Sequence, residues 1–280
     1  MSGLPETPLE RIRAHLVGLK MSRALEALDA CVRRVEDGEL SALEFLDELL
    51  GEEQATRESR RIKSSLMTAR LTRIKTLDSF DFSFQPSLDK NRILALAELS
   101  FIARGEVVHL LGPPGTGKSH LAIALGVEAV KARKSVYFAT LAEIIDSLKK
   151  AEREGKLAQR IAFITRVALL IIDEVGYLPV QPGGANLFFQ LINARYERGA
   201  MILTSNRGFS EWGEVFGDTV VAAALLDRLL HHAIVVEIAG NSYRLREHAK
   251  LVPDNLRLPP ISAPEKPKKR RGRPPKRLKN

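Results

Sequence analysis

The sequence predicts an α/β protein in which helices cover both faces of a parallel β-sheet. From residue 107 onward, short runs rich in β-branched residues alternate with longer helical patterns, which is typical of parallel strands joined by crossover helices. The chain has 280 residues, of which 45% are hydrophobic, so it can bury one core of this kind and carry a smaller appendage at either end. We expect strands over residues 107–111, 135–138, 167–172, 201–204 and 234–238.

The residues that precede this sheet predict a small helical unit. A hydroxyl residue followed three positions later by Glu is the capping-box pattern of a helix start. It occurs at Thr7 with Glu10 and again at Ser41 with Glu44. We therefore expect an N-terminal helical domain over residues 1–76.

Three alternating aromatic residues lie in the segment that joins the two parts. Phe80, Phe82 and Phe84, followed by Pro86, would share one face of an extended segment. This pattern predicts a linker that packs on the larger domain, which we expect over residues 77–250.

The basic residues are concentrated in two segments. The formal net charge is +9, but residues 265–280 hold nine Lys or Arg and one Glu, so the other 264 residues carry only +1. Residues 54–75 form a second basic segment, with seven bases and one acid. Such charge favours nucleic acid as a partner, through local surfaces rather than through the whole molecule.

Composition argues against a membrane or secreted protein. The longest apolar runs, residues 167–172 and 220–226, are far shorter than the roughly 18 residues that cross a bilayer, and no signal-peptide pattern is present. The single cysteine, Cys31, can form neither an internal disulfide nor a zinc site of paired cysteines. We expect a cytoplasmic protein with no membrane partner.

A phosphate-binding loop follows the first predicted strand. Residues 112–119 match the pattern G-x-x-x-x-G-K-[ST]. A helical stretch over residues 119–133 continues from them, as this motif requires. Backbone N–H groups would surround the phosphates, Lys118 would reach the β and γ phosphates, and the Ser119 hydroxyl would bind Mg²⁺. The predicted ATP-binding residues are Gly112, Pro113, Pro114, Gly115, Thr116, Gly117, Lys118 and Ser119.

Two acids, Asp173 and Glu174, end the third predicted strand. Open α/β sheets place their ligand chemistry at this end of the strands. Downstream of a phosphate-binding loop, the pattern has the form of a Walker B motif. Asp173 would hold Mg²⁺ through water, and Glu174 would orient and deprotonate the water that attacks ATP.

Two further polar residues each allow two interpretations. Asn206 follows the fourth predicted strand, where its amide could contact the γ phosphate and the attacking water, but Asn also favours turns. Arg228 lies in a helical run over residues 220–233. It could be a solvated surface residue, which composition alone favours, or an arginine finger that reaches the nucleotide of a neighbouring subunit.

Longer segments carry a resemblance to one family. The chain resembles the IstB-type transposition helper ATPases, relatives of the DnaC helicase loaders and of the initiator DnaA within the AAA+ class, over about residues 5–250. The loop and strand motifs are shared by many families, whereas residues 184–207 and the segment around Trp212 are far more specific. The matching segments are GPPGTGKSHLAIALG, LLIIDEVGYLP, GANLFFQLINARYERG, ILTSN, FSEWGEVFGD, LLDRLLHHA and SYRLR.

The resemblance implies an AAA+ sheet in strand order 5-1-4-3-2 and ATP-driven homo-oligomers that bind and bend double-stranded DNA. It also implies stimulation of a cognate transposase. Asn206 falls on the sensor I position and Arg228 on the arginine-finger position, while Arg244 or Arg246 falls near sensor II.

The length after the fifth strand departs from a standard AAA+ module. Only about 40 residues follow, most of them in the basic tail, so we expect no C-terminal lid domain. The nucleotide would then be less enclosed. We expect the isolated protein to hold ATP weakly until a neighbouring subunit and DNA complete the site.

Two segments are candidates for DNA contact. Residues 251–280 are too poor in hydrophobic residues to form a core, so we expect a disordered basic tail. Its Arg-Gly-Arg-Pro sequence looks like an AT-hook for the minor groove, although a non-specific basic tail or a nuclear-localisation lookalike has a similar composition. The N-terminal basic segment could contact DNA or form a solvated helix face. The candidate residues are Arg57, Arg60, Arg61, Lys63, Arg271, Gly272, Arg273 and Pro274.

These features predict an ATP-dependent, DNA-binding regulator of transposition. It would oligomerise on target DNA, remodel it and stimulate a transposase while hydrolysing ATP to ADP and phosphate. Two other functions would use the same residues. A replicative helicase loader of the DnaC type would share the catalytic set, and a DNA-bending scaffold would use ATP only to hold the oligomer together.

Overall fold

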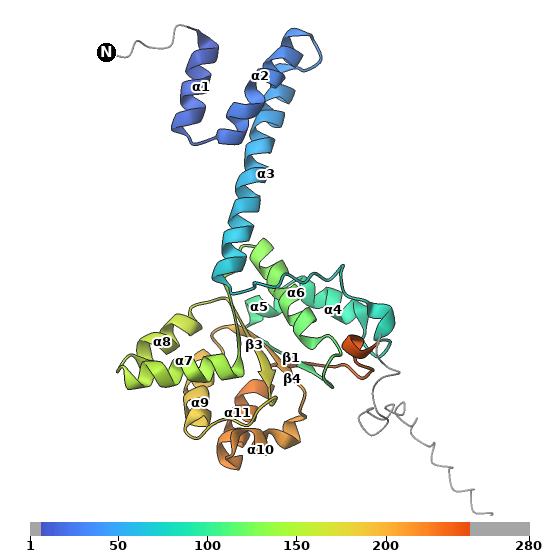
Figure 1. Ribbon diagram of the computed structural model, residues 1–280, viewed down its shortest axis with the longest axis vertical. Helices are drawn as coiled ribbons and strands as arrows, with labels where there is room; N and C mark the ends of the chain where they lie inside the picture. The colour runs from blue at the N-terminus through green and yellow to red at the C-terminus, as the bar shows by residue number, and fades with distance from the viewer. Residues whose placement is uncertain (1–6, 247–280) are drawn as a thin grey trace, which may run out of the picture.

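A five-stranded parallel sheet forms the centre of the structure, a computed structural model that describes residues 7–246 (Figure 1). The strand order is β2-β3-β4-β1-β5, with every neighbouring pair parallel. Read from the opposite edge, this is the order 5-1-4-3-2, so the predicted topology is confirmed. The strands are β1 (Val107–Leu111), β2 (Val136–Thr140), β3 (Leu169–Val175), β4 (Ala200–Ser205) and β5 (Ala233–Glu237).

Successive residues of the central strands face opposite sides of the sheet. In β3, Leu170 and Ile172 pack into one hydrophobic cluster, whereas Leu169 and Ile171 pack into the other. All four side chains are fully buried. The strand is therefore apolar at consecutive positions because both of its faces are covered, as the α/β prediction requires.

Helices cover the two faces in two groups (Figure 1). The helices after β2 pack on one face, and those around β1 pack on the other. No helix in the described part of the chain is long and apolar enough to cross a membrane. The first group is α7 (Leu141–Arg153), α8 (Leu157–Thr165), α9 (Gly184–Arg195), α10 (Trp212–Phe216) and α11 (Thr219–Leu230); the second is α4 (Lys90–Ala97), α5 (Ser100–Arg104) and α6 (Lys118–Lys131).

Two buried polar side chains join helices to the sheet. The Arg195 guanidinium on α9 donates to the carbonyl oxygens of Ala200 at 2.7 Å and Ala168 at 3.3 Å, and burial lowers its pKa to about 10. His109 in β1 lies 3.2 Å from the Leu229 carbonyl oxygen, and burial lowers its pKa to about 4. The imidazole is therefore neutral at pH 7 and ties α11 to β1.

Three helices precede the sheet domain: α1 (Pro8–Gly18), α2 (Ser22–Glu36) and α3 (Ala42–Thr68). The predicted capping boxes at Thr7 and Ser41 are both present and begin α1 and α3. Glu53 of α3 is buried and accepts hydrogen bonds from the backbone N–H groups of Arg23 and Ala24. It thereby caps the N-terminus of α2, and a small hydrophobic cluster holds the three helices together.

Helix α3 reaches from this N-terminal unit to the sheet domain (Figure 1). Leu66 in its last turns and Leu71 just after it belong to the hydrophobic cluster beneath α6. Arg61 donates to the carbonyl oxygens of Val130 and Lys131, which are the last two residues of α6. The C-terminal end of α3 is thus fastened to the domain that carries the phosphate-binding loop.

The aromatic linker packs on the sheet domain, but the prediction that it is extended was wrong. Residues Phe82–Phe84 form a short 3-10 helix, η1, because the Asp81 carboxylate accepts hydrogen bonds from two backbone N–H groups of this turn. Such local caps compete with extended structure. Phe80 is buried, and the Phe84 ring packs edge-on against Tyr243, with centroids 5.1 Å apart.

The chain after β5 passes along the phosphate-binding loop. The Ile238 N–H donates to the Leu111 carbonyl oxygen at 2.8 Å, and the Tyr243 N–H donates to the Gly115 carbonyl oxygen at 3.0 Å. Within residues 7–246 only the 3-10 helix η3 (Tyr243–Leu245) follows β5, so this part of the chain contains no helical lid. The predicted basic tail lies outside the described residues.

Candidate nucleotide-binding site

The phosphate-binding loop connects β1 to α6 and is confined by distant segments. Gly115 and Gly117 have φ values of +81° and +98°, which residues with side chains rarely adopt. A Cβ at Gly115 would lie 2.0 Å from the Ser242 Oγ, and one at Gly117 would lie 2.5 Å from the Phe80 ring. Glycine is therefore required both by the backbone conformation and by the close approach of the linker and the chain after β5.

Lys118 and Thr116 bind back onto the loop. The Lys118 Nζ donates to the Pro113 carbonyl oxygen at 2.7 Å, and the Thr116 hydroxyl donates to the same oxygen at 2.9 Å. The pKa of Lys118 is lowered to about 8, mainly by burial; Asp173 acts in the opposite direction, and the nearby Arg244 cation contributes to the lowering. A buried ammonium bonded to a neutral carbonyl is suited to bind an anion, because the anion would offset its desolvation.

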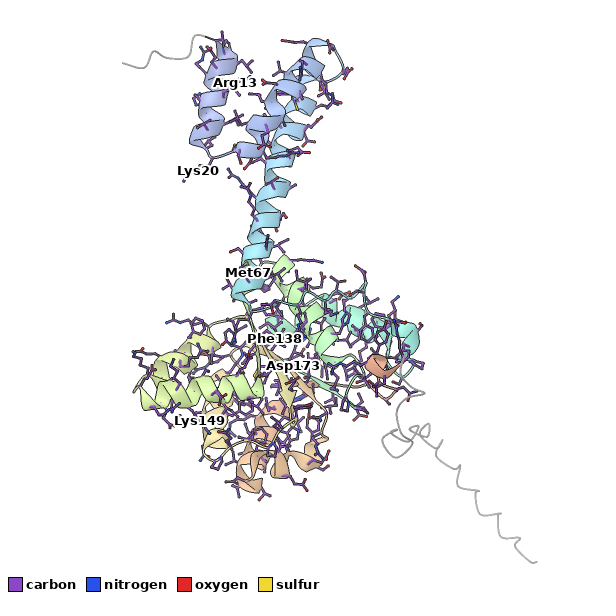
Figure 2. All side chains as sticks on the ribbon, in the orientation of Figure 1. Arg13, Lys20, Met67, Phe138, Lys149 and Asp173 are labelled. Carbon is purple, nitrogen blue, oxygen red and sulfur yellow. The ribbon has the colours of Figure 1, made fainter. Side chains whose placement is uncertain are left out.

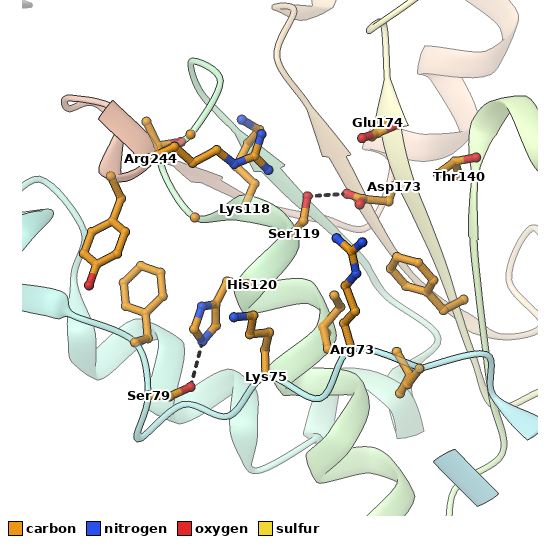
Figure 3. A pocket seen from close by; sticks show the side chains of 18 of the residues that line it. Arg73, Lys75, Ser79, Lys118, Ser119, His120, Thr140, Asp173, Glu174 and Arg244 are labelled. Atoms are coloured by element: carbon orange, nitrogen blue, oxygen red, sulfur yellow. Dashed lines mark hydrogen bonds between the residues drawn. The ribbon is translucent and has the colours of Figure 1, made fainter. Parts of the chain in front are cut away.

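The Asp173 carboxylate, in the middle of the sheet domain (Figure 2), joins the loop to the ends of β3 and β4. Its Oδ1 accepts a hydrogen bond of 2.8 Å from the Ser119 hydroxyl and another from the Thr204 hydroxyl (Figure 3). The Thr204 Oγ1 in turn accepts from the Glu174 N–H at 3.0 Å. The structure thus brings together the two residues predicted as magnesium ligands, and a hydroxyl beside a carboxylate fits the oxygen preference of Mg²⁺.

Glu174 adopts an unusual backbone conformation, with φ of +62°. The β3–β4 register shifts here, between Ile172 and Val175. As a result the Glu174 side chain is exposed at the strand end, whereas Asp173 stays buried. Strain of this kind clusters at functional sites, and here it separates the positions of two neighbouring acids.

A pocket of about 640 Å³ lies over the loop (Figure 3). It is lined by the loop and the start of α6, the ends of β2 and β3, the linker and the chain after β5. The linker contributes the basic residues Arg70, Arg73 and Lys75. The size and the positive charge of the pocket suit an anionic ligand as large as a nucleotide.

The two sensor II candidates lie apart. Arg244 lines the pocket and is drawn beside Lys118 in Figure 3. Arg246 lies over the Tyr243 ring, with its guanidinium carbon 4.1 Å from the ring centroid. Of these two residues, Arg244 is the one that the fold brings to the pocket.

Asn206 and Arg228 lie outside the lining of the pocket. Asn206 follows β4, and its Oδ1 is buried without a hydrogen-bond partner among the described residues, so it is available to a ligand or a water molecule. Arg228 on α11 donates to the Asn193 Oδ1 at 3.1 Å and lies 4.8 Å from the centroid of the Phe189 ring. Its guanidinium is therefore held against α9 rather than at the pocket of its own chain.

The four DNA-binding candidates on α3 form two pairs. Arg57 is bonded to Glu53 at 2.7 Å, and Arg61 is bonded to carbonyl oxygens of α6, so both support the packing of helices. Arg60 and Lys63 are exposed and make no hydrogen bond or ion pair through their side chains within residues 7–246. These two charges are free to meet phosphates. The tail candidates Arg271, Gly272, Arg273 and Pro274 lie outside the described residues.

Sequence patterns missed several residues of the site. Thr204 binds Asp173, and a signal for it existed: β3 and β4 are neighbours in the expected order, so a hydroxyl at the end of β4 should lie beside the acids. Arg73 and Lys75 were noted only as part of a basic segment for DNA. No local pattern distinguishes a charge that faces a pocket from one that faces solvent, so their position had to come from the fold.

The profile of the IstB-like ATP binding proteins matches residues 14–251 of this chain. That span includes the phosphate-binding loop, the acids after β3 and the chain after β5. The chain belongs to this family. The resemblance seen in the motifs is therefore confirmed over nearly its whole expected extent.

Members of the family from insertion sequences match almost the full length. A protein named for ATP binding in insertion sequence IS21 of Pseudomonas aeruginosa is 45% identical over 257 residues, which are 92% of this chain and 97% of the relative. A protein named likewise in IS5376 of Geobacillus stearothermophilus is 44% identical over 238 residues, covering 85% of this chain and 95% of the relative.

Solved structures share the AAA+ fold. The replication initiator DnaA bound to AMPPCP and single-stranded DNA matches with a TM-score of 0.50 and 23% identity. The match covers 63% of this chain and 54% of that one. At this identity the likeness concerns the fold of the sheet domain.

The lowered pKa of Lys118 predicts that ATP binding weakens at alkaline pH. Triphosphate attracts the protonated ammonium, and with a pKa of about 8 most of that form is lost between pH 7.5 and pH 9. We expect the affinity for ATP, measured by titration with a fluorescent analogue, to fall roughly tenfold over this range. Lys118→Arg keeps its charge and should remove most of the dependence. An equal pH dependence of ATP affinity in both proteins would contradict the assignment of this dependence to Lys118.

Proposed function

We propose that this protein is a magnesium-dependent ATPase that oligomerises on double-stranded DNA and stimulates the transposase of its insertion sequence. The observation that carries the ATPase proposal is the Ser119–Asp173 hydrogen bond beside Lys118, at the floor of a nucleotide-sized pocket. Membership in a family named for ATP binding, with relatives from insertion sequences, supports the biological role.

The residues have distinct tasks in ATP hydrolysis. The loop and Lys118 would bind the phosphates, and Ser119 with Asp173 would hold Mg²⁺, which would supply charge neutralisation at the β and γ phosphates. Glu174 is exposed at the strand end, where it would orient the attacking water and accept its proton. The unpartnered Oδ1 of Asn206 would accept a hydrogen bond from the same water. Phosphoryl transfer needs this positioning more than covalent chemistry.

The DNA and partner contacts divide among the parts of the chain. We assign residues 1–76 to DNA and oligomer contacts, residues 77–250 to the ATPase, and residues 251–280 to a basic arm for the minor groove. Arg60 and Lys63 are the exposed charges of α3 that support this division. A DNA-bound oligomer would also tighten ATP binding, because a neighbouring subunit would add contacts to a pocket whose walls, within residues 7–246, include no helical lid.

Replacing the general base tests whether turnover is part of the function. In Glu174→Gln the amide retains the size of the side chain but cannot accept the proton, so we expect phosphate release to fall on the order of 10²-fold or more. ATP affinity should stay within about twofold, because Glu174 holds no phosphate. Glu98→Gln, at an exposed position outside the pocket, is the matched control.

The same variant separates the proposal from an ATP-bound scaffold. If Glu174→Gln assembles on DNA and supports full transposition through repeated rounds, hydrolysis is dispensable and the scaffold function is correct. If the purified protein instead captures a replicative helicase and no transposase, the loader function replaces the one proposed.

The position of Arg228 predicts a catalytic site shared between subunits. Its guanidinium is held against α9 by Asn193 and Phe189, so it would act on the nucleotide of the neighbour. We expect Arg228→Ala and Lys118→Ala to lose ATPase activity by about 10³-fold each, the scale of a lost arginine finger.

Mixing the two inactive proteins provides the decisive readout. A mixed oligomer contains interfaces with an intact loop from one chain and an intact arginine from the other, so part of the ATPase activity should return. Mixtures that stay inactive, although light scattering shows that they assemble, would contradict action in trans.

A further inference from the structure

The linker between α3 and α4 crosses the edge of the nucleotide pocket and is fastened to it. The Phe138 N–H donates to the Ala69 carbonyl oxygen at 2.9 Å, which holds the start of the linker on β2. Further along, the His120 Nε2 lies 2.9 Å from the Thr76 carbonyl oxygen. Phe80 then packs its ring against Gly117. The linker is therefore bound to α6 and the loop at its far end, and to the sheet at its near end.

Two basic side chains lie between these anchor points. Arg73 and Lys75 line the pocket, are exposed, and make no hydrogen bond or ion pair within the described part of the chain. Arg70, three residues before Arg73, differs from them because its guanidinium is bonded to the Tyr137 hydroxyl at 3.2 Å and paired with Glu143. The linker thus carries one basic residue that supports the fold and two whose charges face the pocket without a partner.

The direction of these side chains points to the phosphates. In Figure 3 the Arg73 guanidinium is directed toward the Ser119–Asp173 pair, and Lys75 lies beside His120 at the start of α6. The helix N-terminus and the loop already make this region positive. Arg244 adds to that potential, as its effect on the pKa of Lys118 indicates. Several unneutralised cations around one pocket are unfavourable unless a polyanion binds among them.

We propose that Arg73 and Lys75 bind the phosphates of the nucleotide, so that occupancy of the pocket fixes the linker and, through it, the direction of α3. This inference rests on the proposed function, because it takes ATP as the ligand. Arg73 would contact the end of the triphosphate near Ser119 and Asp173, with the planar geometry that guanidinium groups offer to phosphate oxygens. Lys75 would act as a more mobile charge beside it.

The consequence is a direct mechanical connection between nucleotide and DNA-contacting parts. Only residues 69–72 separate the end of α3 from Arg73, and Leu66 and Leu71 on either side of this turn share one hydrophobic cluster with α6. A linker held at Arg73 would hold this cluster, and α3 would then project in one direction. Loss of the γ phosphate would release the Arg73 contact and leave α3 held only by its apolar cluster and by the Arg61 bonds to α6.

Trypsin provides a direct probe of the linker, because it cleaves after lysine and arginine and therefore after Arg73 and Lys75. We expect saturating ATP with Mg²⁺ to slow cleavage after Arg73 and Lys75 at least roughly tenfold, as identified by mass spectrometry, since bound phosphates would occupy both side chains. Cleavage after Lys156, exposed between α7 and α8 and outside the pocket, is the internal control and should not change. ADP should protect less than ATP.

Variants give the second readout. Arg73→Ala should weaken ATP binding roughly tenfold and ADP binding less, because a charge-assisted contact to the terminal phosphate is lost. Arg73→Lys should restore part of the difference. Arg92→Ala and Lys134→Ala remove exposed charges outside the pocket and should leave both affinities unchanged.

The outcomes distinguish this inference from the proposed function. If the wild-type protein binds ATP while neither the trypsin pattern nor the affinity of Arg73→Ala changes, the linker inference is wrong and the ATPase proposal stands. If the wild-type protein binds no ATP, with or without DNA, the ATPase proposal fails first. Protection at both bonds together with selective loss of ATP affinity supports the linker contact.

Discussion

The hydrogen bond between Ser119 and Asp173 is the contact on which the geometry of the site depends. It joins the first turn of α6 to the end of β3, and Thr204 joins the same carboxylate to the end of β4. Three segments that are far apart in the sequence therefore meet at one oxygen atom. Parallel strands make this possible, since their carboxyl ends lie at one edge of the sheet. The Asp173 carboxylate is buried, so loss of its hydroxyl partners would leave it unsatisfied.

Around this contact, the walls of the pocket come from outside the central strands. The linker places Phe80 on Gly117, and the chain after β5 places Ser242 on Gly115. These approaches explain why the loop needs glycine where it does. They also give the pocket partial enclosure in a chain whose described residues contain no helical lid. A site assembled from a linker on one side and a short 3-10 turn on the other is well placed to respond to movement of either.

Local motifs predicted the centre of the site, and the fold determined its periphery. Gly112 to Ser119 and the pair Asp173–Glu174 are contiguous patterns whose chemistry follows from residue type and strand context. The strand order came from the family resemblance. Thr204 and the linker cations could not be found in the same way, because their roles arise from contacts across more than 30 residues of sequence. The alternation of aromatic residues predicted an extended linker. That pattern does not take account of the Asp81 side chain, which caps a 3-10 turn here.

The magnesium dependence of ATP affinity in Asp173→Asn tests the central claim most directly. With an intact carboxylate, Mg²⁺ should strengthen ATP binding by roughly tenfold or more, because Ser119 and Asp173 would hold the metal and its charge would offset that of the phosphates. The asparagine variant should lose this gain while it retains the metal-free affinity within a few fold, and Asp146→Asn, exposed on α7, should behave like the wild type. An Asp173→Asn protein with the full magnesium effect would contradict the account.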